Sequence, residues 1–414
     1  MKILLLSATF PYPPTKGGTP VRTFNLLQYL HHRHEVTLLT HAGNDIDPAD
    51  IAALGEQVGE LVVFPRPQGE LKSGIFAKLG RSLQSFSQGT PTNVLYGYSP
   101  AMQGWIDRHL REFSVVTCEH SVNEIYLPKQ PPIPAVVNIH SSLYGTCQQL
   151  LATKTATHPL RDRLNLPLLY NYERRYCQKF SSIVVTTTED QAYLQPFAPY
   201  TPFEVIPNGV DLARFPLRRE DPGGYKLIFT GAMDILPNID AAEFLSRAIL
   251  PAVRQLYPET TLELVGDRPV PAVLALAQLP GVQVTGKVPS MVESLHRATL
   301  CVIPMRAGLG IKNKTLEALA AGIPVVGSDR ALEGLRVDGD DVPLRALRAN
   351  SISEYVAAIS RLFADPSLRG ELSKQGRSLI ADQFTWEIAG ARYERVLSQS
   401  HKKESKNKFP ELGE

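Results

Sequence analysis

The sequence is poor in cysteine and nearly balanced in charge. Its 414 residues include four cysteines, Cys118, Cys147, Cys177 and Cys301, which lie far apart with no CxxC pair. This spacing argues against a zinc site and a disulfide scaffold, and it favours a reducing compartment. The formal net charge is +2, which gives no sign of a polyanion-binding surface, so nucleic acid is not an expected partner.

The sequence also lacks a long apolar run. The longest, such as ILLL at residues 3–6, fall far short of the ~20 residues that span a bilayer. Met1 and Lys2 lead straight into that run and then into a proline-rich loop, so we expect neither a transmembrane helix nor a signal peptide, and we predict a cytoplasmic protein. A chain of 414 residues is too long for one ordinary core, so we expect two domains of roughly 200 residues each.

Short apolar runs separated by helix-length segments organise the first half of the chain. This alternation is typical of a parallel sheet covered by helices on both faces. Between the first two runs, PYPPTKGG precedes an apolar-periodic helix, for which we expect Thr19 as the cap and Pro20 as the first residue. The runs are KILLLS (2–7), EVTLLT (35–40), SVVT (114–117), AVVNIH (135–140) and SIVVTTT (182–188).

The alternation restarts after a connection rich in proline, glycine and charge at residues 216–225. Ligands of such sheets bind outside the carboxyl ends of the strands, so the loops that begin at Gly231, Gly266, Gly286 and Met305 are expected to face one cleft. The further runs are KLIFTG (226–231), TLELVG (261–266), VQVTG (282–286), TLCVIP (299–304) and IPVVGS (323–328). We therefore predict an α/β protein with doubly wound Rossmann-like domains at 1–205 and 206–380, a helix at 381–400 and a disordered tail at 401–414.

The string RAGLGIKNKTLE has a glycine-rich turn that leads into a cation-bearing helix. Gly308 and Gly310 let backbone N–H groups approach an anion closely, and the helix start adds partial positive charge. Lys312 and Lys314 fall near the first helical turn, where a cation is normally unfavourable but is tolerated if a diphosphate lies there. Glu317 is on the same helix face as Lys314, and its carboxylate can accept hydrogen bonds from two ribose hydroxyls.

A plainer interpretation of this string is a loop–helix–strand corner. The glycines then only form a turn, and Lys314 and Glu317 form a surface ion pair worth about 0.2–0.5 kcal/mol. Because neither GxxxxGK[ST] nor GxGxxG is present, these residues alone leave both interpretations open.

Together with FEVIPNGVDLARF (203–215), FTGAMDILPNIDAAEFL (229–245) and Phe384-Thr385-Trp386, this string resembles the family 4, or group 1, retaining glycosyltransferases of the GT-B fold. Within the family it is most similar to bacterial sugar transferases associated with exopolysaccharide and PEP-CTERM sorting systems. The resemblance implies two domains that face a central cleft, with a C-terminal helix that crosses back to the first domain. It implies a nucleoside diphosphate sugar held by the second domain and a glycan or lipid-linked acceptor held mainly by the first.

By position, Glu317 matches the glutamate that binds the donor ribose, and Lys314 and Arg306 match basic positions beside the diphosphate. Two features depart from the family pattern: Leu309 replaces the first acid of Glu-x7-Glu, and the loop after Gly231 lacks the usual Arg and Lys. We therefore expect the cations of RAGLGIKNKTLE to replace that charge. The expected donor-binding residues are Gly18, Gly231, Gly308, Gly310, Lys312, Lys314 and Glu317.

In the first domain, TKGGTPVR resembles the family's N-terminal glycine loop, so Gly17, Gly18 and Arg22 are expected on the acceptor side, with Arg22 reaching into the cleft. A flexible turn is the alternative. His140 is our first choice and His120 our second for a histidine that hydrogen-bonds the sugar or stabilises developing charge, and ordinary structural histidines remain the alternative. The expected catalytic residues are His140, His120, Arg306 and Lys314.

Asp338-Gly339-Asp340-Asp341 imitates a DxD metal motif, but Asp-Gly is turn chemistry. We predict neither a metal nor another cofactor. The segment LKSGIFAKLGRSLQSF (71–86) is basic and amphipathic, so it predicts either peripheral contact with the inner face of the plasma membrane or a helix packed on its own domain.

The sequence thus predicts a retaining, metal-independent hexosyltransferase, which the resemblance places in bacterial surface polysaccharide synthesis. Two alternatives remain open. One is a nucleotide-sugar epimerase of the same fold. The other is a catalytically degenerate nucleotide-binding scaffold, which the missing acid and the missing Arg/Lys pair would support.

Overall fold

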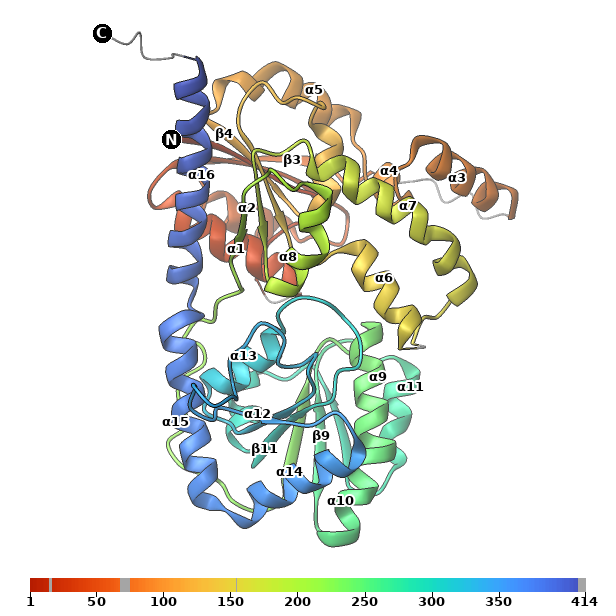
Figure 1. Ribbon diagram of the computed structural model, residues 1–414, viewed down its shortest axis with the longest axis vertical. Coiled ribbons are helices and arrows are strands. Elements are labelled where there is room, and N and C mark those ends of the chain that lie inside the picture. The colour runs from red at the N-terminus through yellow and green to blue at the C-terminus, as the bar shows by residue number, and fades with distance from the viewer. Residues whose placement is uncertain (15–16, 68–74, 154, 409–414) are drawn as a thin grey trace. The chain divides into compact units, whose positions relative to one another are not determined.

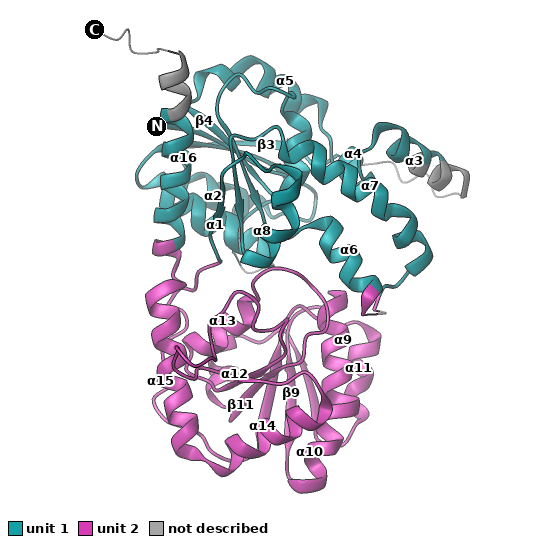
Figure 2. Ribbon diagram, viewed as in Figure 1, with its two compact units in different colours: residues 1–151, 156–207, 389–414 teal, residues 152–155, 208–388 magenta. Residues whose placement is uncertain are grey.

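The computed structural model describes residues 1–14, 17–67, 75–153 and 155–408, which form two compact units (Figures 1 and 2). Unit 1 comprises Met1–Leu151, Ala156–Pro207 and Ala389–Glu414. Unit 2 comprises Ala152–Thr155 and Asn208–Ile388.

Unit 1 is built on a seven-stranded sheet in the order β3-β2-β1-β4-β5-β6-β7, and every neighbouring pair is parallel. The central strands are apolar on both faces because helices cover both sides. The strands are β1 (Lys2–Ser7), β2 (Glu35–Ala42), β3 (Glu60–Pro65), β4 (Val115–Glu119), β5 (Ala135–Ile139), β6 (Ser182–Val185) and β7 (Phe203–Val205). The helices are α1 (Gly18–His31), α2 (Pro48–Gly55), α3 (Ile75–Gln88), α4 (Thr92–Tyr96), α5 (Pro100–His109), α6 (Leu143–Ala152), α7 (Pro159–Cys177) and α8 (Thr188–Leu194).

Unit 2 repeats this arrangement with six strands in the order β10-β9-β8-β11-β12-β13, again all parallel. The strands are β8 (Lys226–Thr230), β9 (Thr261–Val265), β10 (Val282–Gly286), β11 (Leu300–Ile303), β12 (Val325–Gly327) and β13 (Leu347–Arg348). The helices are α9 (Leu236–Phe244), α10 (Leu250–Leu256), α11 (Pro271–Leu274), α12 (Met291–His296), α13 (Asn313–Ala320), α14 (Ile352–Ala364) and α15 (Pro366–Gln383).

The last helix, α16 (Trp386–Lys408), returns to unit 1 and lies beside α1 (Figure 1). A Cβ atom on Gly390 would lie 2.1 Å from the ring of Tyr29, so only glycine allows this close approach. The Glu394 carboxylate also lies 2.8 Å from Nε2 of His34. The predicted crossing helix is therefore confirmed.

The predicted Rossmann-like architecture is confirmed, and all ten apolar runs contain strands. The expected cap at Thr19 is wrong, because α1 begins at Gly18 without a side-chain cap and Thr19 bonds a histidine instead. The helix α16 also continues through Lys408, into the segment that the sequence predicted as a disordered tail. In the described part of the chain, no helix is both long and apolar enough to cross a bilayer.

Each sheet reverses its strand order at one point. In unit 1 the reversal lies between β1 and β4, and in unit 2 between β8 and β11. Doubly wound sheets bind ligands at the carboxyl ends of the strands beside such a reversal.

Candidate functional site

In unit 2, the side chain of Lys314 is partly buried beside the strand reversal. It projects from the first turn of α13, and its Nζ donates a 2.6 Å hydrogen bond to Oδ1 of Asn238. The ammonium also lies 4.2 Å from the ring centroid of Phe229 and 3.9 Å from Sδ of Met305. All three contacting groups are neutral, so none of them carries a negative charge that balances the ammonium of Lys314.

Burial lowers the pKa of Lys314 from its ordinary 10.5 to about 7. Among the described residues, no carboxylate lies within ion-pair distance of its Nζ, and the surface pair with Glu317 that the plainer interpretation requires does not form. A buried amine without an acid is costly unless an anion binds beside it. A bound anion beside Lys314 would offset this cost.

Lys312 has a different environment. It is the N-cap residue of α13 rather than part of its first turn, and its Nζ bonds the backbone oxygen of Gly310. It also lies 3.3 Å from the buried carboxylate of Glu333, which a second cation, Arg330, approaches at 3.3 Å. Lys312 is thus neutralised within the unit, and it fixes the glycine loop to the segment after β12.

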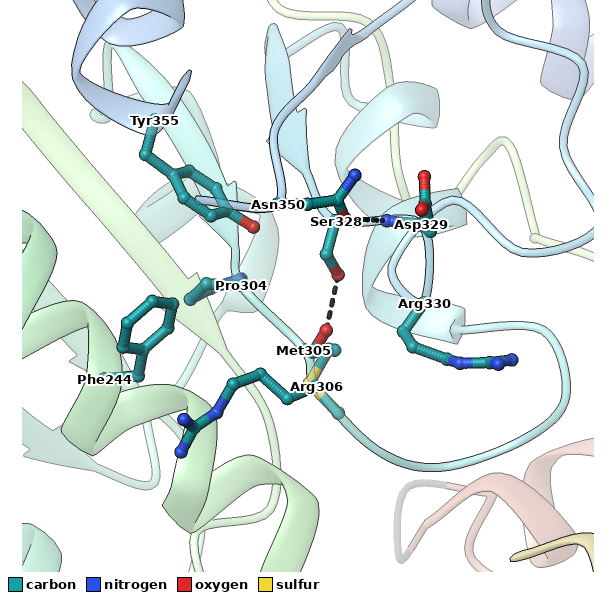
Figure 3. A pocket seen from close by; sticks show the side chains of 9 residues that line it. All are labelled: Phe244, Pro304, Met305, Arg306, Ser328, Asp329, Arg330, Asn350 and Tyr355. Carbon is teal, nitrogen blue, oxygen red and sulfur yellow. Dashed lines mark hydrogen bonds between the residues drawn. The ribbon is translucent and has the colours of Figure 1, made fainter. Parts of the chain in front are cut away.

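Arg306 binds an acid of α9. Its guanidinium forms a two-point ion pair with Asp240 and stacks 4.9 Å from the ring centroid of Phe244, both on α9. Figure 3 shows it directed toward Phe244 at the edge of a pocket of about 300 Å³. Asp240 thus pairs with Arg306 in the free protein, and the role expected for Arg306 beside the diphosphate remains a prediction.

Glu317 lies one turn after Lys314 on α13, and no described residue hydrogen-bonds its carboxylate. Burial raises the pKa of Glu317 to about 7, against the opposing effects of Arg214 and Lys314. A carboxyl group with unused hydrogen-bonding capacity suits the two adjacent hydroxyls of a ribose.

The glycines of unit 2 create the space around these side chains. Gly308 and Gly310 have φ of 97° and 83°, so the predicted turn requires residues that tolerate the left-handed region. A Cβ atom on Gly231 would lie 2.7 Å from Nζ of Lys314. Glycine at position 231 therefore leaves room for the ammonium group.

In unit 1, His140 follows β5; its Nδ1 has a hydrogen-bond partner, whereas its buried Nε2 has none among the described residues. Its Nδ1 lies 3.1 Å from Oγ1 of Thr19, and its Nε2 lies 3.6 Å from Oε2 of Glu119. Because a hydroxyl can donate and a carboxylate only accepts, this geometry favours a proton on Nε2. Burial lowers the pKa of His140, so the ring is neutral.

His120 follows β4, and its ring lies edge-on to that of His140, with 5.3 Å between centroids. Its backbone has φ 72° and ψ 153°, a region that is essentially restricted to glycine and costs of the order of 1–3 kcal/mol for other residues. The Ser121 N–H donates a 2.9 Å hydrogen bond to Nδ1, and burial lowers the pKa of His120 to about 3. The ring is therefore neutral, with its proton on Nε2.

Arg22 does not reach outward as expected. It is 1% exposed, and its Nε and Nη2 donate hydrogen bonds of 3.1 and 2.9 Å to Oδ1 of Asn138. The guanidinium is therefore buried within unit 1 and binds the side chain of Asn138 on β5. Gly17 and Gly18 are exposed at the start of α1, with Gly17 at φ 114°, whereas Thr15 and Lys16 of the same loop lie outside the described residues.

The acids of the DxD-like segment are engaged by arginines. Asp338 lies 2.9 Å from Arg348, and Asp341 lies 2.6 Å from Arg336. Within the described ranges, no three His, Cys, Asp or Glu side chains are grouped so that they could hold a metal ion. The absence of a metal requirement remains a prediction.

The sequence reasoning missed three residues that organise these clusters. In unit 2, Asn238 binds Lys314. In unit 1, Glu119 lies beside His140, and the Tyr393 hydroxyl donates a 2.9 Å hydrogen bond to Glu119. A carboxylate directly after the run VVTC is the sequence signal for Glu119. The contact from Tyr393, 274 positions away in sequence, depends on tertiary structure.

Two family models match the chain. The model described as Glycosyltransferase Family 4 matches residues 16–214, and the model described as Glycosyl transferases group 1 matches residues 224–365. Together they include every strand of the two sheets except β1, and they contain His120, His140, Lys314 and Glu317.

Two curated proteins are similar over about half of this chain. A GDP-mannose-dependent monoacylated alpha-(1-6)-phosphatidylinositol monomannoside mannosyltransferase of Corynebacterium glutamicum is 29% identical in an alignment of length 231 that covers 49% of this chain and 57% of that protein. A GDP-mannose-dependent alpha-(1-6)-phosphatidylinositol monomannoside mannosyltransferase of Mycolicibacterium smegmatis is 28% identical in an alignment of length 232 that covers 49% of this chain and 58% of that protein. The chain thus spans little more than half the length of these relatives.

Solved structures share the fold over nearly the whole chain. Sucrose-phosphate synthase from Thermosynechococcus elongatus has a TM-score of 0.70 at 20% identity, covering 96% of this chain and 98% of that one. Anabaena HepE in complex with UDP and glucose has a TM-score of 0.65 at 15% identity, covering 96% of this chain and 100% of that one. At these identities the likeness establishes the GT-B fold alone.

Proposed function

Because the chain belongs to the family 4, or group 1, glycosyltransferases, we propose that it transfers a sugar from a nucleoside diphosphate sugar to a hydroxyl acceptor. The observation that carries this proposal is Lys314, a partly buried lysine beside the strand reversal of unit 2 that forms no ion pair with any described carboxylate. The donor diphosphate would bind Lys314 and the start of α13, and the ribose would bind Glu317. The domain roles follow the family: unit 2 holds the donor, and unit 1 holds the acceptor.

For the sugar and the acceptor we propose mannose, carried on GDP, and a lipid-linked glycan. The support is the pair of curated relatives, both described as GDP-mannose-dependent enzymes that act on phosphatidylinositol mannosides. Exposed Leu83 (64%) and Phe86 (48%) on α3 support contact with a membrane surface. Residues 71–74 of that segment lie outside the described residues. A place in surface polysaccharide synthesis remains part of this proposal.

Retention of configuration follows from the proposed family chemistry. With Leu309 at the place of the first family acid, no carboxylate nucleophile is supplied there. We therefore favour the route in which the leaving diphosphate helps to deprotonate the acceptor hydroxyl on the same face of the sugar. Lys314 would stabilise the negative charge that develops on the leaving group.

The test is thermal-shift binding of nucleoside diphosphates and their sugars without added metal. A ligand that binds only the folded protein raises the melting temperature in proportion to the logarithm of its concentration over its dissociation constant. We expect a selective shift with GDP or GDP-mannose that is lost in Lys314→Met. No shift with any nucleotide would contradict the proposal, whereas binding without turnover would favour a nucleotide-binding scaffold.

A further inference from the structure

The side chain of Asn238, in the first turn of α9, is a fixed hydrogen-bond acceptor for Lys314. Its Oδ1 accepts a 2.6 Å hydrogen bond from Nζ of Lys314, and its Nδ2 donates one of 2.8 Å to the carbonyl of Ala232. The reversed amide would place N–H donors against the ammonium and an oxygen against the carbonyl, so these two contacts fix its orientation. The place of the acceptor is therefore set by the loop after β8.

The loop between β8 and α9 also holds the backbone of this residue. The N–H of Asn238 donates a 2.8 Å hydrogen bond to the carbonyl of Ile235, whose own N–H donates one of 3.3 Å to the carbonyl of Ala232. A Cβ atom on Gly231 would lie 3.0 Å from Nδ2 of Asn238. Glycine at position 231 therefore leaves room for the amide as well as for the ammonium.

Two acids flank Asn238 in sequence, and each is paired with an arginine. Asp234 accepts a 2.6 Å hydrogen bond from Arg268, and Asp240 accepts one of 2.9 Å from Arg306. The amide of Asn238 carries no charge. This segment therefore gives the lysine ammonium an acceptor but no counter-ion, although it contains two carboxylates.

Three other titratable groups act on the ammonium of Lys314. Cys301 on β11 and Glu317 on α13 raise its pKa, and Lys312 at the N-cap of α13 lowers it. Burial has the largest effect, and it brings the pKa to about 7. Neither Cys301 nor Glu317 hydrogen-bonds Nζ, so neither takes the place of Asn238.

The contacts of Lys314 leave part of its ammonium available. An ammonium group has three N–H donors. Asn238 accepts from one of them, and the sulfur of Met305, a weak acceptor, lies 3.9 Å from Nζ. The ring of Phe229 attracts the cation through its face and carries no charge. At least one N–H of Lys314 therefore remains for an anion.

We infer that Asn238 is a positioning residue for Lys314: its neutral amide orders the ammonium without cancelling its charge, so that the charge acts on the diphosphate of the donor. This inference rests on the proposed function. Asn238 lies within residues 229–245, which contain neither Arg nor Lys. This segment would thus contribute to the diphosphate subsite through a lysine of α13 rather than through a cation of its own.

Asn238→Asp is the direct test, because it keeps the shape of the side chain and adds a charge. The carboxylate should form an ion pair with Lys314 that cancels its charge and raises its pKa. The dissociation constant of GDP-mannose at pH 6 should therefore rise at least about 10-fold. The affinity of the variant should not decline between pH 6 and pH 8.5, where that of wild type does, because the lysine remains protonated. Gln255→Glu adds the same charge at an exposed position on α10, and this matched control should bind as wild type does.

A double-mutant cycle separates positioning of Lys314 from a general structural role. Asn238→Ala should raise the dissociation constant of GDP-mannose about 2–10-fold in the wild-type background. In the Lys314→Met background the same change should have no further effect, since the lysine on which it acts is absent. A loss of equal size in both backgrounds would overturn the inference, because Asn238 would then act through the fold alone.

A further readout needs no donor. In protein labelled with ¹³C-lysine, the Cε signal of Lys314, assigned by its loss in Lys314→Met, should titrate near pH 7 in wild type. In Asn238→Asp its midpoint should be at least about one pH unit higher. An unchanged midpoint would show that residue 238 does not act on the ammonium, and it would overturn the inference.

The outcomes separate the two claims. Failure of wild type to bind GDP-mannose, UDP-glucose or inorganic pyrophosphate contradicts the proposed function, and the lysine titration then decides the contact of Asn238 by itself. Binding by wild type together with equal affinity in Asn238→Asp overturns the assignment of Asn238 while the function stands.

Discussion

Replacement of Lys314 by methionine is the most informative perturbation of unit 2. Methionine retains most of the chain length and apolar volume of lysine but removes the charge. In the free protein the buried ammonium has only neutral partners, the amide oxygen of Asn238 at 2.6 Å and the ring of Phe229 at 4.2 Å. We therefore expect Lys314→Met to have an unchanged or higher melting temperature without ligand, whereas a lysine with a structural role would leave the variant less stable.

The same change should weaken donor binding. A hydrogen bond from a charged donor to a phosphate is worth about 1.5–3 kcal/mol, so the dissociation constant of GDP-mannose at pH 6 should rise about 10–150-fold. Lys374→Met is the matched control, because Lys374 is exposed on α15 of the same unit. Equal affinities in Lys314→Met and wild type would refute the diphosphate subsite.

The pH dependence of GDP-mannose binding tests whether the charged form of Lys314 raises the affinity. The pKa of Lys314 in the free protein is about 7, so between pH 6 and pH 8.5 the charged fraction falls roughly 30-fold, and the affinity should fall with it. GDP-mannose is the right ligand, because its diphosphate has no terminal phosphate that titrates in this range. Glu317, whose pKa is also about 7, loses its proton over the same range and favours binding at high pH. Isothermal titration should therefore show a decline in wild type that Lys314→Met abolishes or reverses, and an equal decline in both would contradict the account.

Three further predictions concern the surroundings of the two clusters. Gly231→Ala places a Cβ atom 2.7 Å from the Lys314 ammonium, so donor affinity should fall at least about 10-fold; unchanged affinity by titration would show that the ammonium position is not critical. Tyr393→Phe removes a 2.9 Å hydrogen bond to buried Glu119 and should lower the free energy of unfolding by about 1–3 kcal/mol, measured by urea denaturation; no change would mean that the carboxylate finds another donor. A double change of Leu83 and Phe86 to serine should reduce sedimentation with anionic vesicles without lowering the melting temperature. Equal sedimentation of the variant and wild type would show that these two side chains of α3 do not contact the membrane.

The sequence predicted the architecture because parallel sheets covered on both faces produce long apolar strands with distinct boundaries. The edge strands β3, β7 and β13 were missed, since β3 and β7 are only half-buried and β13 has two residues. Edge strands are defined mainly by their pairing with a neighbour, which one sequence does not reveal.

The candidate site was predicted in part. The positions of Lys314 and Glu317 followed from helical spacing, and the strand-end histidines followed from the apolar runs. The directions of Arg306 and Arg22 did not follow, because each is set by a distant partner, Asp240 and Asn138 respectively. Position along the chain predicts which edge of a sheet a residue occupies, but ion pairs and burial decide where a long side chain points.

The central claim is that this chain transfers a sugar from a nucleoside diphosphate sugar. The most direct measurement is the transfer of labelled mannose from GDP-mannose to a phosphatidylinositol mannoside in vesicles, followed without added metal and repeated with UDP-glucose as the competing donor. The account predicts a labelled lipid whose new linkage keeps the donor's α configuration, formed by wild type and lost in Lys314→Met. Binding of the nucleotide sugar without any labelled product, across a panel of donors and acceptors, would contradict it.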